Sequence, residues 1–185
     1  ASRGVSFLVG ARPGGAGKTT VMGAALNLVP ADITLVAADS RAVRDAEQCK
    51  NAVRRCYVCH EIGVGHWFAY LWGADLRAYC ALHRRGHMLA ANLHADDVEE
   101  AHRQICGGNG VREEDFRAFR LLIFLRVGRG ASPRRWIEKV YLAEGEPPHR
   151  LVFDASAPLL RMDTAPGDGW QAECRSFLEN TLKAP

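Results

Sequence analysis

The sequence predicts an α/β fold in which a mostly parallel sheet lies between helices, and two observations carry this prediction. Short apolar runs typical of buried strands alternate with segments of helical spacing, and a glycine-rich loop joins the first strand to the first helix. Such alternation is typical of parallel sheets with helices on both faces. A length of 185 residues matches a single domain, at about 150 residues per domain.

Each element follows from a local pattern. Apolar runs predict strands at residues 5–10, 33–38, 56–62, 67–72, 88–93 and 120–127, the first two of them buried. Helical spacing predicts helices at residues 18–28, 74–84 and 96–105, while the polar segment 41–52 fits a helix or a loop. Residues 136–143 and 150–155 flank a Glu-Gly-Glu-Pro-Pro turn and predict a hairpin, and residues 168–183 predict a terminal helix. We expect residues 1–143 to form the core, with residues 144–185 completing the hairpin and adding the helix on the same domain.

Composition excludes several classes of protein. The net charge is +3, from 24 Lys and Arg against 21 Asp and Glu, and the cations are scattered, so we expect solvated surface charge and no direct nucleic-acid binding. An uncharged apolar stretch of the roughly 18 residues needed for a membrane span is missing, as is a signal peptide, so an integral membrane protein is not expected. The six cysteines are expected to be free thiols in a reducing cytoplasm. Because the chain begins with Ala1 rather than Met, sequence could precede it.

The strongest chemical signal is the glycine-rich loop, which reads Arg-Pro-Gly-Gly-Ala-Gly-Lys-Thr-Thr over residues 12–20. Backbone N–H groups of such a loop can surround a phosphate chain, and the N-terminus of the following helix attracts the same anion. The pattern is that of a P-loop, although Arg12 stands where the consensus has glycine. Lys18 would reach the β- and γ-phosphates, and the Thr19 hydroxyl would ligate Mg²⁺. The predicted site for ATP and Mg²⁺ comprises Pro13, Gly14, Gly15, Ala16, Gly17, Lys18, Thr19 and Thr20.

A second segment resembles a known family. Residues 86–101 read Gly-His-Met-Leu-Ala-Ala-Asn-Leu-His-Ala-Asp-Asp-Val-Glu-Glu-Ala. This is similar to the secretion ATPases, the motors of type II secretion, type IV pili and conjugation, in which Gly-His opens a strand that ends in Leu-His-Ala before a helix. The resemblance keeps the same order over roughly residues 5–143. It implies a RecA-like P-loop NTPase fold, ATP hydrolysis, a homohexameric ring and a secretion or pilus membrane platform as partner.

The resemblance also implies roles for residues at strand ends. His94 matches a histidine that lies near the γ-phosphate, although a lone histidine at a strand end is more often ordinary. In the family the second strand ends in Glu-Asp, whose glutamate helps to activate water, and here the pair is Ala38-Asp39. We therefore expect Asp39 and His94 to act at the site.

The acid of the Walker B strand is less clearly placed. That strand normally ends in Gly-Glu, and here Gly73 is followed by Ala74, with Asp75 one residue further on. Asp75 would either hold Mg²⁺ through a water and act in catalysis, or cap the next helix. Glu61 is a rival acid at a strand end, for which a surface position is favoured.

These departures leave several functions open. A missing general base costs about 10²–10⁴-fold in rate, which predicts slow hydrolysis or binding without turnover. The main alternative is therefore a degenerate nucleotide-binding subunit with a regulatory or structural role. A small-molecule P-loop kinase would need an arginine-rich lid, which does not stand out, and a partition ATPase would need a lysine at Pro13. The family's N-terminal domain, which supplies arginines to the nucleotide, is not expected within residues 1–185.

Two further patterns carry structural alternatives. Cys56-Tyr-Val-Cys59-His60 matches the attachment string of c-type haem and half of a zinc knuckle, but buried thiols are the default for both cysteines. The aromatic cluster of Trp67, Phe68, Tyr70 and Trp72 is expected in the core or in a subunit contact rather than stacked on bases, because no basic residues interleave with it.

Overall fold

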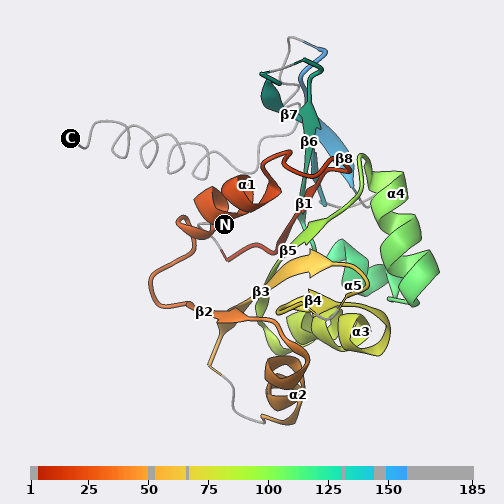
Figure 1. The fold of residues 1–185 in the computed structure, drawn as a ribbon. Coiled ribbons are helices and arrows are strands. Elements are labelled where there is room, and N and C mark those ends of the chain that lie inside the picture. The colour runs from red at the N-terminus through yellow and green to blue at the C-terminus, as the bar shows by residue number, and fades with distance from the viewer. Residues whose placement is uncertain (1–3, 50–52, 66, 131, 144–148, 158–185) are drawn as a thin grey trace.

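The structure is a computed structural model that describes residues 4–49, 53–65, 67–130, 132–143 and 149–157. Its strands are β1 (Phe7–Gly10), β2 (Thr34–Ala37), β3 (Arg55–Ile62), β4 (Tyr70–Leu71), β5 (Met88–Leu93), β6 (Leu121–Val127), β7 (Arg135–Leu142) and β8 (Arg150–Asp154). They form one sheet in the order β2-β3-β5-β1-β6-β7-β8, with β4 paired to the end of β3. All pairs from β2 to β6 are parallel, whereas β7 and β8 are antiparallel. The predicted α/β fold with a mostly parallel sheet is confirmed (Figure 1).

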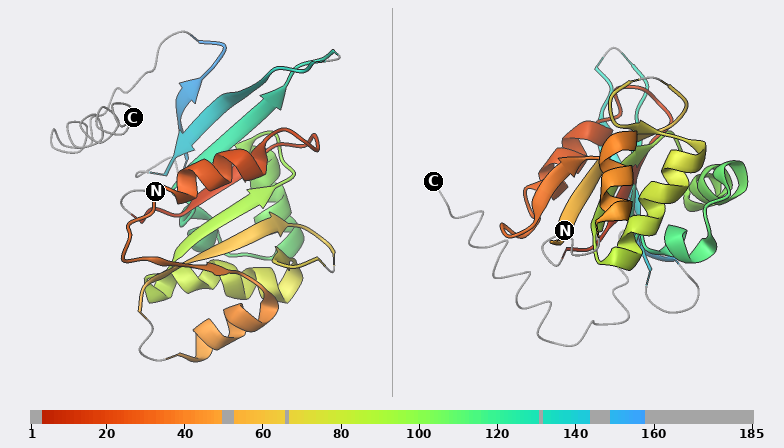
Figure 2. Two further views of the ribbon diagram at one scale, coloured as in Figure 1. Left: turned by 60° about the vertical axis from the view of Figure 1, so that its left-hand side comes forward. Right: turned by 90° about the horizontal axis from the view of Figure 1, so that it is seen from below.

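The helices divide unequally between the two faces of the sheet. They are α1 (Lys18–Leu26), α2 (Ser40–Gln48), α3 (Gly73–Ala81), α4 (Val98–His102) and α5 (Glu113–Arg117), with a 3₁₀ turn η1 (Leu82–Arg85) and a π-helical turn η2 (Arg103–Gly107). One apolar cluster joins α1 to the sheet, and the other joins the remaining helices to its opposite face. Figure 2 shows α1 on one side of the strands, with α2 and α3 on the other.

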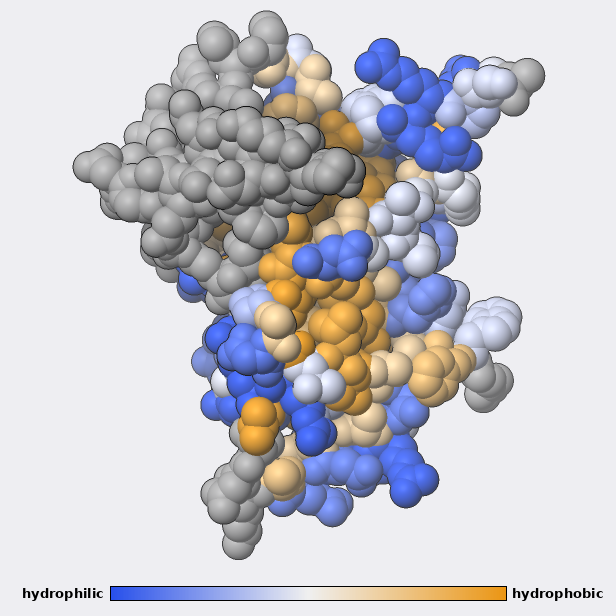
Figure 3. All heavy atoms as spheres, turned by 90° about the vertical axis from the view of Figure 1, so that its left-hand side faces the viewer, coloured by the Kyte–Doolittle hydropathy of each residue, from blue (hydrophilic) through white to orange (hydrophobic). Residues whose placement is uncertain are grey.

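The expectation that the second strand is buried is wrong. β2 lies at the edge of the sheet, paired with β3 alone, and Leu35 is 47% exposed. The physical reason is the position of α1, which contacts β1 and β5 and leaves the same face of β2 uncovered. Figure 3, which looks onto this side of the molecule, shows an apolar area flanked by hydrophilic side chains.

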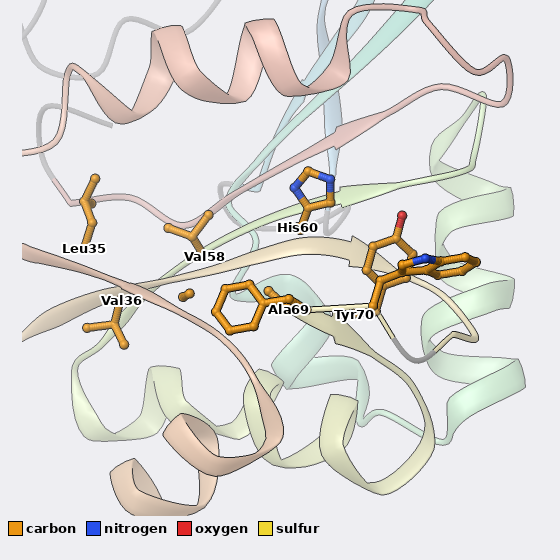
Figure 4. Close-up of a pocket in the computed structure, with 9 residues that line it drawn as sticks. Leu35, Val36, Val58, His60, Ala69 and Tyr70 are labelled. Atoms are coloured by element: carbon orange, nitrogen blue, oxygen red, sulfur yellow. The ribbon is translucent and has the colours of Figure 1, made fainter.

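An apolar groove lies at the β2 edge of the sheet and continues onto the loop before β4. We call it the β2–β3 groove, and it is lined by Leu35, Val36, Ala37, Val58, His60, Trp67, Phe68, Ala69 and Tyr70. Figure 4 shows that Leu35, Val58 and His60 point to the side of the sheet on which α1 lies. Trp67 and Phe68 are 69% and 71% exposed, so a core position for these two residues is wrong. A subunit contact remains a prediction.

The remaining expectations have mixed outcomes. The hairpin is present as β7 and β8, but its turn at residues 144–148 and the predicted helix at residues 168–183 lie outside the described residues. The strand expected at residues 67–72 is reduced to β4, and α5 was not predicted. Within the described part of the chain, none of the helices is both long and apolar enough to cross a membrane.

Candidate functional site: a phosphate loop with a buried acid

The glycine-rich loop connects β1 to α1 and adopts backbone conformations that require glycine. Gly15 and Gly17 have φ angles of 71° and 96°, and Gly17 is the N-cap of α1. A Cβ atom placed on Gly14 or Gly15 would meet nothing within 4 Å, so the loop has an open side. The cavity on this side has a volume of about 600 Å³ and is lined by Gly14, Gly15, Ala16, Gly17, Lys18, Thr19, Thr20, Glu61, His94 and Arg135. Ligand pockets typically have about 300–1,000 Å³, so this cavity could hold a phosphorylated ligand.

Lys18 is the buried cation of this cavity. Its Nζ lies 3.3 Å from the Ala11 carbonyl oxygen and 3.4 Å from Oε2 of Glu61. A buried ammonium group is stable only when its charge is paired and its hydrogens are donated. The positive charge of Lys18 therefore lies beside the open side of the glycine-rich loop.

Glu61 is brought to the loop by the strand order. β5 lies between β1 and β3, and the register aligns both Gly10 and Ile62 with Leu93, so the carboxyl ends of the three strands meet. Ligands of open α/β sheets bind at this edge. The surface position favoured for Glu61 is wrong, because the residue is 6% exposed.

One oxygen of Glu61 has no partner. Among the described residues, Oε1 of Glu61 and Oδ1 of the neighbouring Asn92 are buried without a hydrogen-bond donor. Leaving a buried acceptor unsatisfied costs about 1–3 kcal/mol, and more for a charged group. Such orphaned acceptors fit a site that receives a hydrated cation or a water when its ligand is bound.

The two aspartates expected at the site lie elsewhere. Asp39 is the N-cap of α2, and its Oδ1 accepts a hydrogen bond of 2.7 Å from the Ala42 N–H. Asp75, in the first turn of α3, accepts from the Ser40 hydroxyl and lies 3.8 Å from an Arg44 nitrogen. Neither aspartate lines the phosphate-loop cavity, so the structure separates both from the residues that they were expected to join.

His94 follows β5 and lines the cavity as expected from its place in the chain. Its Nδ1 lies 2.9 Å from the Arg12 carbonyl oxygen, and because a carbonyl can only accept, Nδ1 carries the proton. Both ring nitrogens lie 3.4 Å from Nζ of Lys18, and Nε2 lies 3.6 Å from Oε2 of Glu61. The Gln104 amide fixes the backbone by donating to the His94 carbonyl at 2.8 Å.

Arg135 is a cavity residue that the sequence reasoning missed. It lies at the start of β7, and its Nε donates a hydrogen bond of 2.6 Å to the Gly15 carbonyl. The signal in the sequence was the Arg134-Arg135 pair beside the predicted hairpin, which by itself reads as surface charge. The hairpin thus brings a second cation to the loop.

Arg12, in the place of the consensus glycine, anchors the loop from outside the cavity. Its Nε donates to the Glu100 carboxylate at 2.9 Å, and its backbone N–H donates to Asp96 at 2.8 Å. The hydrogen bond from Arg12 lowers the pKa of Glu100. Although Arg12 replaces the consensus glycine, its side chain therefore does not occupy the side of the loop that faces the cavity.

The donor set fits Mg²⁺ and a polyphosphate. Mg²⁺ prefers oxygen ligands and usually keeps several waters, being held by one or two carboxylates together with substrate phosphates. Thr19 and Glu61 both line this cavity and carry oxygens of this kind, and Oε1 of Glu61 is unpaired. Backbone N–H groups of the loop and Lys18 would face the phosphates.

The Cys-x-x-Cys-His string does not form a ligand site. Cys56 packs in the apolar cluster beneath α1, whereas Cys59 packs in the cluster on the opposite face of the sheet. Burial raises the pKa of the Cys56 thiol to about 12. The two cysteines are buried thiols, as expected by default, and cannot share a haem or a zinc ion.

The comparisons with known proteins agree with this fold. No family model matches the chain, and no curated protein matches it in sequence. Among solved structures, the chain is similar to the VirB11 ATPase of the Brucella suis type IV secretion system, determined in complex with sulphate, with a TM-score of 0.54 and 18% sequence identity. The match covers 77% of this chain and 49% of that chain, so this chain corresponds to about half of the length of that ATPase. This likeness shows a similar fold over the shared part of the two chains.

Proposed function

We propose that this chain is the nucleotide-binding core of a secretion-type motor and that it hydrolyses Mg²⁺-ATP to ADP and inorganic phosphate. The observation that carries the proposal is the buried Glu61 carboxylate, which lies beside Lys18 of the phosphate loop with one oxygen unpaired. A glycine-rich turn without a ligand gives no reason to bury an acid there. The likeness to the VirB11 ATPase supports the fold on which this site is built.

The roles follow from the geometry of the cavity. The backbone N–H groups of residues 14–20 surround the phosphates, next to Pro13, which has no N–H to donate. Lys18 leaves Glu61 and pairs with the β- and γ-phosphates. Thr19 would hold Mg²⁺ directly and Glu61 would hold it through a water, and the ion would neutralise charge on the phosphates. His94 Nε2 faces the γ-phosphate as a sensor, and Arg135 adds positive charge from the side of β7.

Hydrolysis transfers the γ-phosphoryl group of ATP to a water oxygen, and ADP is the leaving group. The work of the protein is positioning and charge stabilisation rather than covalent chemistry. Glu61 orients this water and accepts its proton, a role that the sequence reasoning gave to Asp39 and Asp75. Because Ala38 stands where the family has a second glutamate, we expect slow turnover.

The alternative is a subunit that binds ATP without turnover, and Ala38 and Ala74 are the residues that favour it. One purified sample distinguishes the two by Mg²⁺-ATP binding, measured calorimetrically, and by phosphate release. The proposal expects both activities, and both are lost in Lys18→Ala while circular dichroism shows that the variant is folded. Binding without phosphate release at long times supports the regulatory subunit instead. Absence of ATP binding by the wild-type chain overturns both.

We also propose a ring-shaped homo-oligomer, for which the resemblance implies a hexamer, docked on a secretion or pilus platform at a membrane. The exposed Trp67 and Phe68 of the β2–β3 groove support an association surface of this kind, because large apolar side chains are rarely exposed together on monomers. Light scattering after size-exclusion chromatography with ATP tests it. The wild-type chain should form the larger species and Phe68→Ser should remain a monomer, whereas a wild-type monomer at all concentrations contradicts the ring.

A further inference from the structure

A cluster of three different donor groups lies away from the phosphate-loop cavity, where α4, η2 and α5 meet. His102 ends α4, Cys106 lies in the π-helical turn η2, and Glu113 begins α5. The imidazole, thiol and carboxylate each place one donor atom within 4.8 Å of the other two. Nε2 of His102 lies 2.6 Å from Oε1 of Glu113. None of the three lines the phosphate-loop cavity, so the function proposed above does not use them.

The local backbone explains how the cluster forms. His102 and Cys106 are four residues apart, and the π-helical turn between them changes the angle at which successive side chains leave the helix. Such turns occur frequently at functional sites. A glycine-containing loop, in which Gly110 has a φ angle of 66°, then reverses the chain and brings Glu113 back. Figure 1 shows α4 and α5 as neighbouring elements.

Within the loop that returns Glu113, Asn109 bonds to both η2 and the start of α3. Its Nδ2 donates to the Gln104 carbonyl at 2.7 Å, and its Oδ1 accepts from the Gly73 N–H at 2.7 Å. Asn109 is itself buried. The three donors are therefore set close together by the fold before any ligand arrives.

The chemistry of the donors selects the ion. A set of one nitrogen, one sulfur and one oxygen excludes Mg²⁺ and Ca²⁺, which take oxygen ligands, and suits Zn²⁺. Zinc–ligand distances of about 2.0–2.3 Å in a tetrahedron place the donor atoms about 3.3–3.8 Å apart. The separations here need only small side-chain rotations to reach that range. A thiolate and a carboxylate would neutralise the two charges of the ion.

We propose that His102, Cys106 and Glu113 form a zinc site with three protein ligands and one open position. Zinc binding replaces the thiol proton of Cys106, which passes to solvent, and it replaces the hydrogen bond between His102 and Glu113. His102 and Glu113, but not Cys106, line a cavity of about 400 Å³ together with Glu99, Arg103, Phe116 and His149, and the open position would face this cavity. An exchangeable water completes the tetrahedron there.

Metal binding to the purified chain, freed of metal with a chelator and kept without nucleotide, tests this site. Dialysis against Zn²⁺ and elemental analysis should find one zinc per chain. Cys106→Ser and Glu113→Gln should each weaken binding by more than the roughly 10–100-fold that the loss of an outer-shell partner costs. Glu99→Gln is the matched control, because Glu99 lines the same cavity outside the cluster, and it should bind zinc as the wild type does.

Cobalt(II) in place of zinc identifies the sulfur ligand. A thiolate-to-cobalt charge-transfer band should appear in the wild type, persist in Cys49→Ser and Cys174→Ser, and vanish in Cys106→Ser. The described residues that line the phosphate-loop cavity include no cysteine, so a metal held there by Glu61 and His94 would give no such band. A band that survives in Cys106→Ser, or a wild type that retains no zinc, overturns the proposal.

Alkylation of the unmodified protein gives a readout that needs no variant. Zinc should slow the reaction of Cys106 with iodoacetamide at least tenfold, as followed by peptide mass spectrometry, and leave the rate of the exposed Cys49 unchanged. Equal rates for Cys106 with and without zinc contradict the site even if the substituted chains fail to fold.

Discussion

The Lys18 ammonium lies 3.4 Å from Oε2 of Glu61, and each of the two side chains is no more than 9% exposed. Lys18 begins α1 and Glu61 lies near the end of β3, so the pair joins the helix after the phosphate loop to the strand next but one to β1. In this state the lysine is neutralised by the acid rather than by a phosphate. A bound phosphate that pairs with Lys18 would leave the Glu61 carboxylate free to bind a cation. Phosphate binding by Lys18 and cation binding by Glu61 are thus linked through this one contact.

Replacing one member of this pair should destabilise the protein more than replacing both. Removal of one partner leaves an uncompensated buried charge, which costs about 3–5 kcal/mol, whereas replacing both partners can be nearly neutral. Lys18→Met should therefore lower the free energy of unfolding by that amount in urea titrations without nucleotide. The double variant Lys18→Met/Glu61→Gln should recover most of the loss. Additive effects of the two changes would show that the contact is not coupled in solution.

Glu61 rather than Asp75 should control turnover. Glu61→Gln keeps the size of the side chain but removes the proton acceptor, so phosphate release should fall by about 10²–10⁴-fold while ATP binding is retained. Asp75→Asn is the matched control, because Asp75 contacts Ser40 and Arg44 away from the cavity, and its rate should stay within about threefold of the wild type. Steady-state phosphate release with parallel binding measurements checks both. The reverse ranking of the two variants would restore the role first expected for Asp75.

The coarse fold was predictable because its signals are local. The apolar run before the glycine-rich loop and the helical spacing after it predicted β1 and α1 within a few residues. The turn residues between two amphipathic segments similarly predicted β7 and β8. These elements depend on neighbours in the chain, which a sequence pattern records.

The details that were missed depend on contacts between distant segments. Glu61 lies near the end of one short strand and Asp75 follows another, and the order of strands, with β5 between β1 and β3, decides which acid reaches Lys18. Arg135 reaches Gly15 across 120 positions of the chain, through the pairing of β7 with β6. The exposure of Leu35 likewise depends on where α1 lies. Strand order and helix placement are long-range properties that no local pattern encodes.

Two glycines near the phosphate loop should respond differently to alanine. A Cβ on Gly10 would lie 2.6 Å from the Phe124 ring and 2.7 Å from the Ala95 carbonyl oxygen, whereas a Cβ on Gly14 would meet nothing within 4 Å. Overpacking of a core costs about 1–3 kcal/mol, so Gly10→Ala should lose at least this much stability. Gly14→Ala, the control, should change the free energy of unfolding by less than about 0.5 kcal/mol. Chemical denaturation measures both, and equal losses would contradict the close packing at Gly10.

His87 is a buried imidazole whose titration should affect stability. It is 3% exposed, and its Nδ1 accepts a hydrogen bond of 3.2 Å from the Arg55 N–H, which a protonated ring could not do. Its Nε2 has no partner among the described residues. Burial, followed by the nearby charges of Arg55 and Arg85, lowers the pKa of His87 from its ordinary 6.5.

The free energy of unfolding should therefore fall as the pH drops below about 6.5. In that window the unfolded chain binds a proton at His87 that the folded chain resists, so stability rises with pH until the unfolded pKa is passed. Urea titrations between pH 7.5 and pH 5.5 measure this slope. His87→Asn retains an acceptor for the Arg55 N–H but does not titrate, so its slope should be smaller, with a remainder from His149, whose pKa burial also lowers. A slope that is unchanged in His87→Asn, or an NMR titration that places the pKa of His87 at or above 6.5, would show that the folded protein accommodates the charged ring.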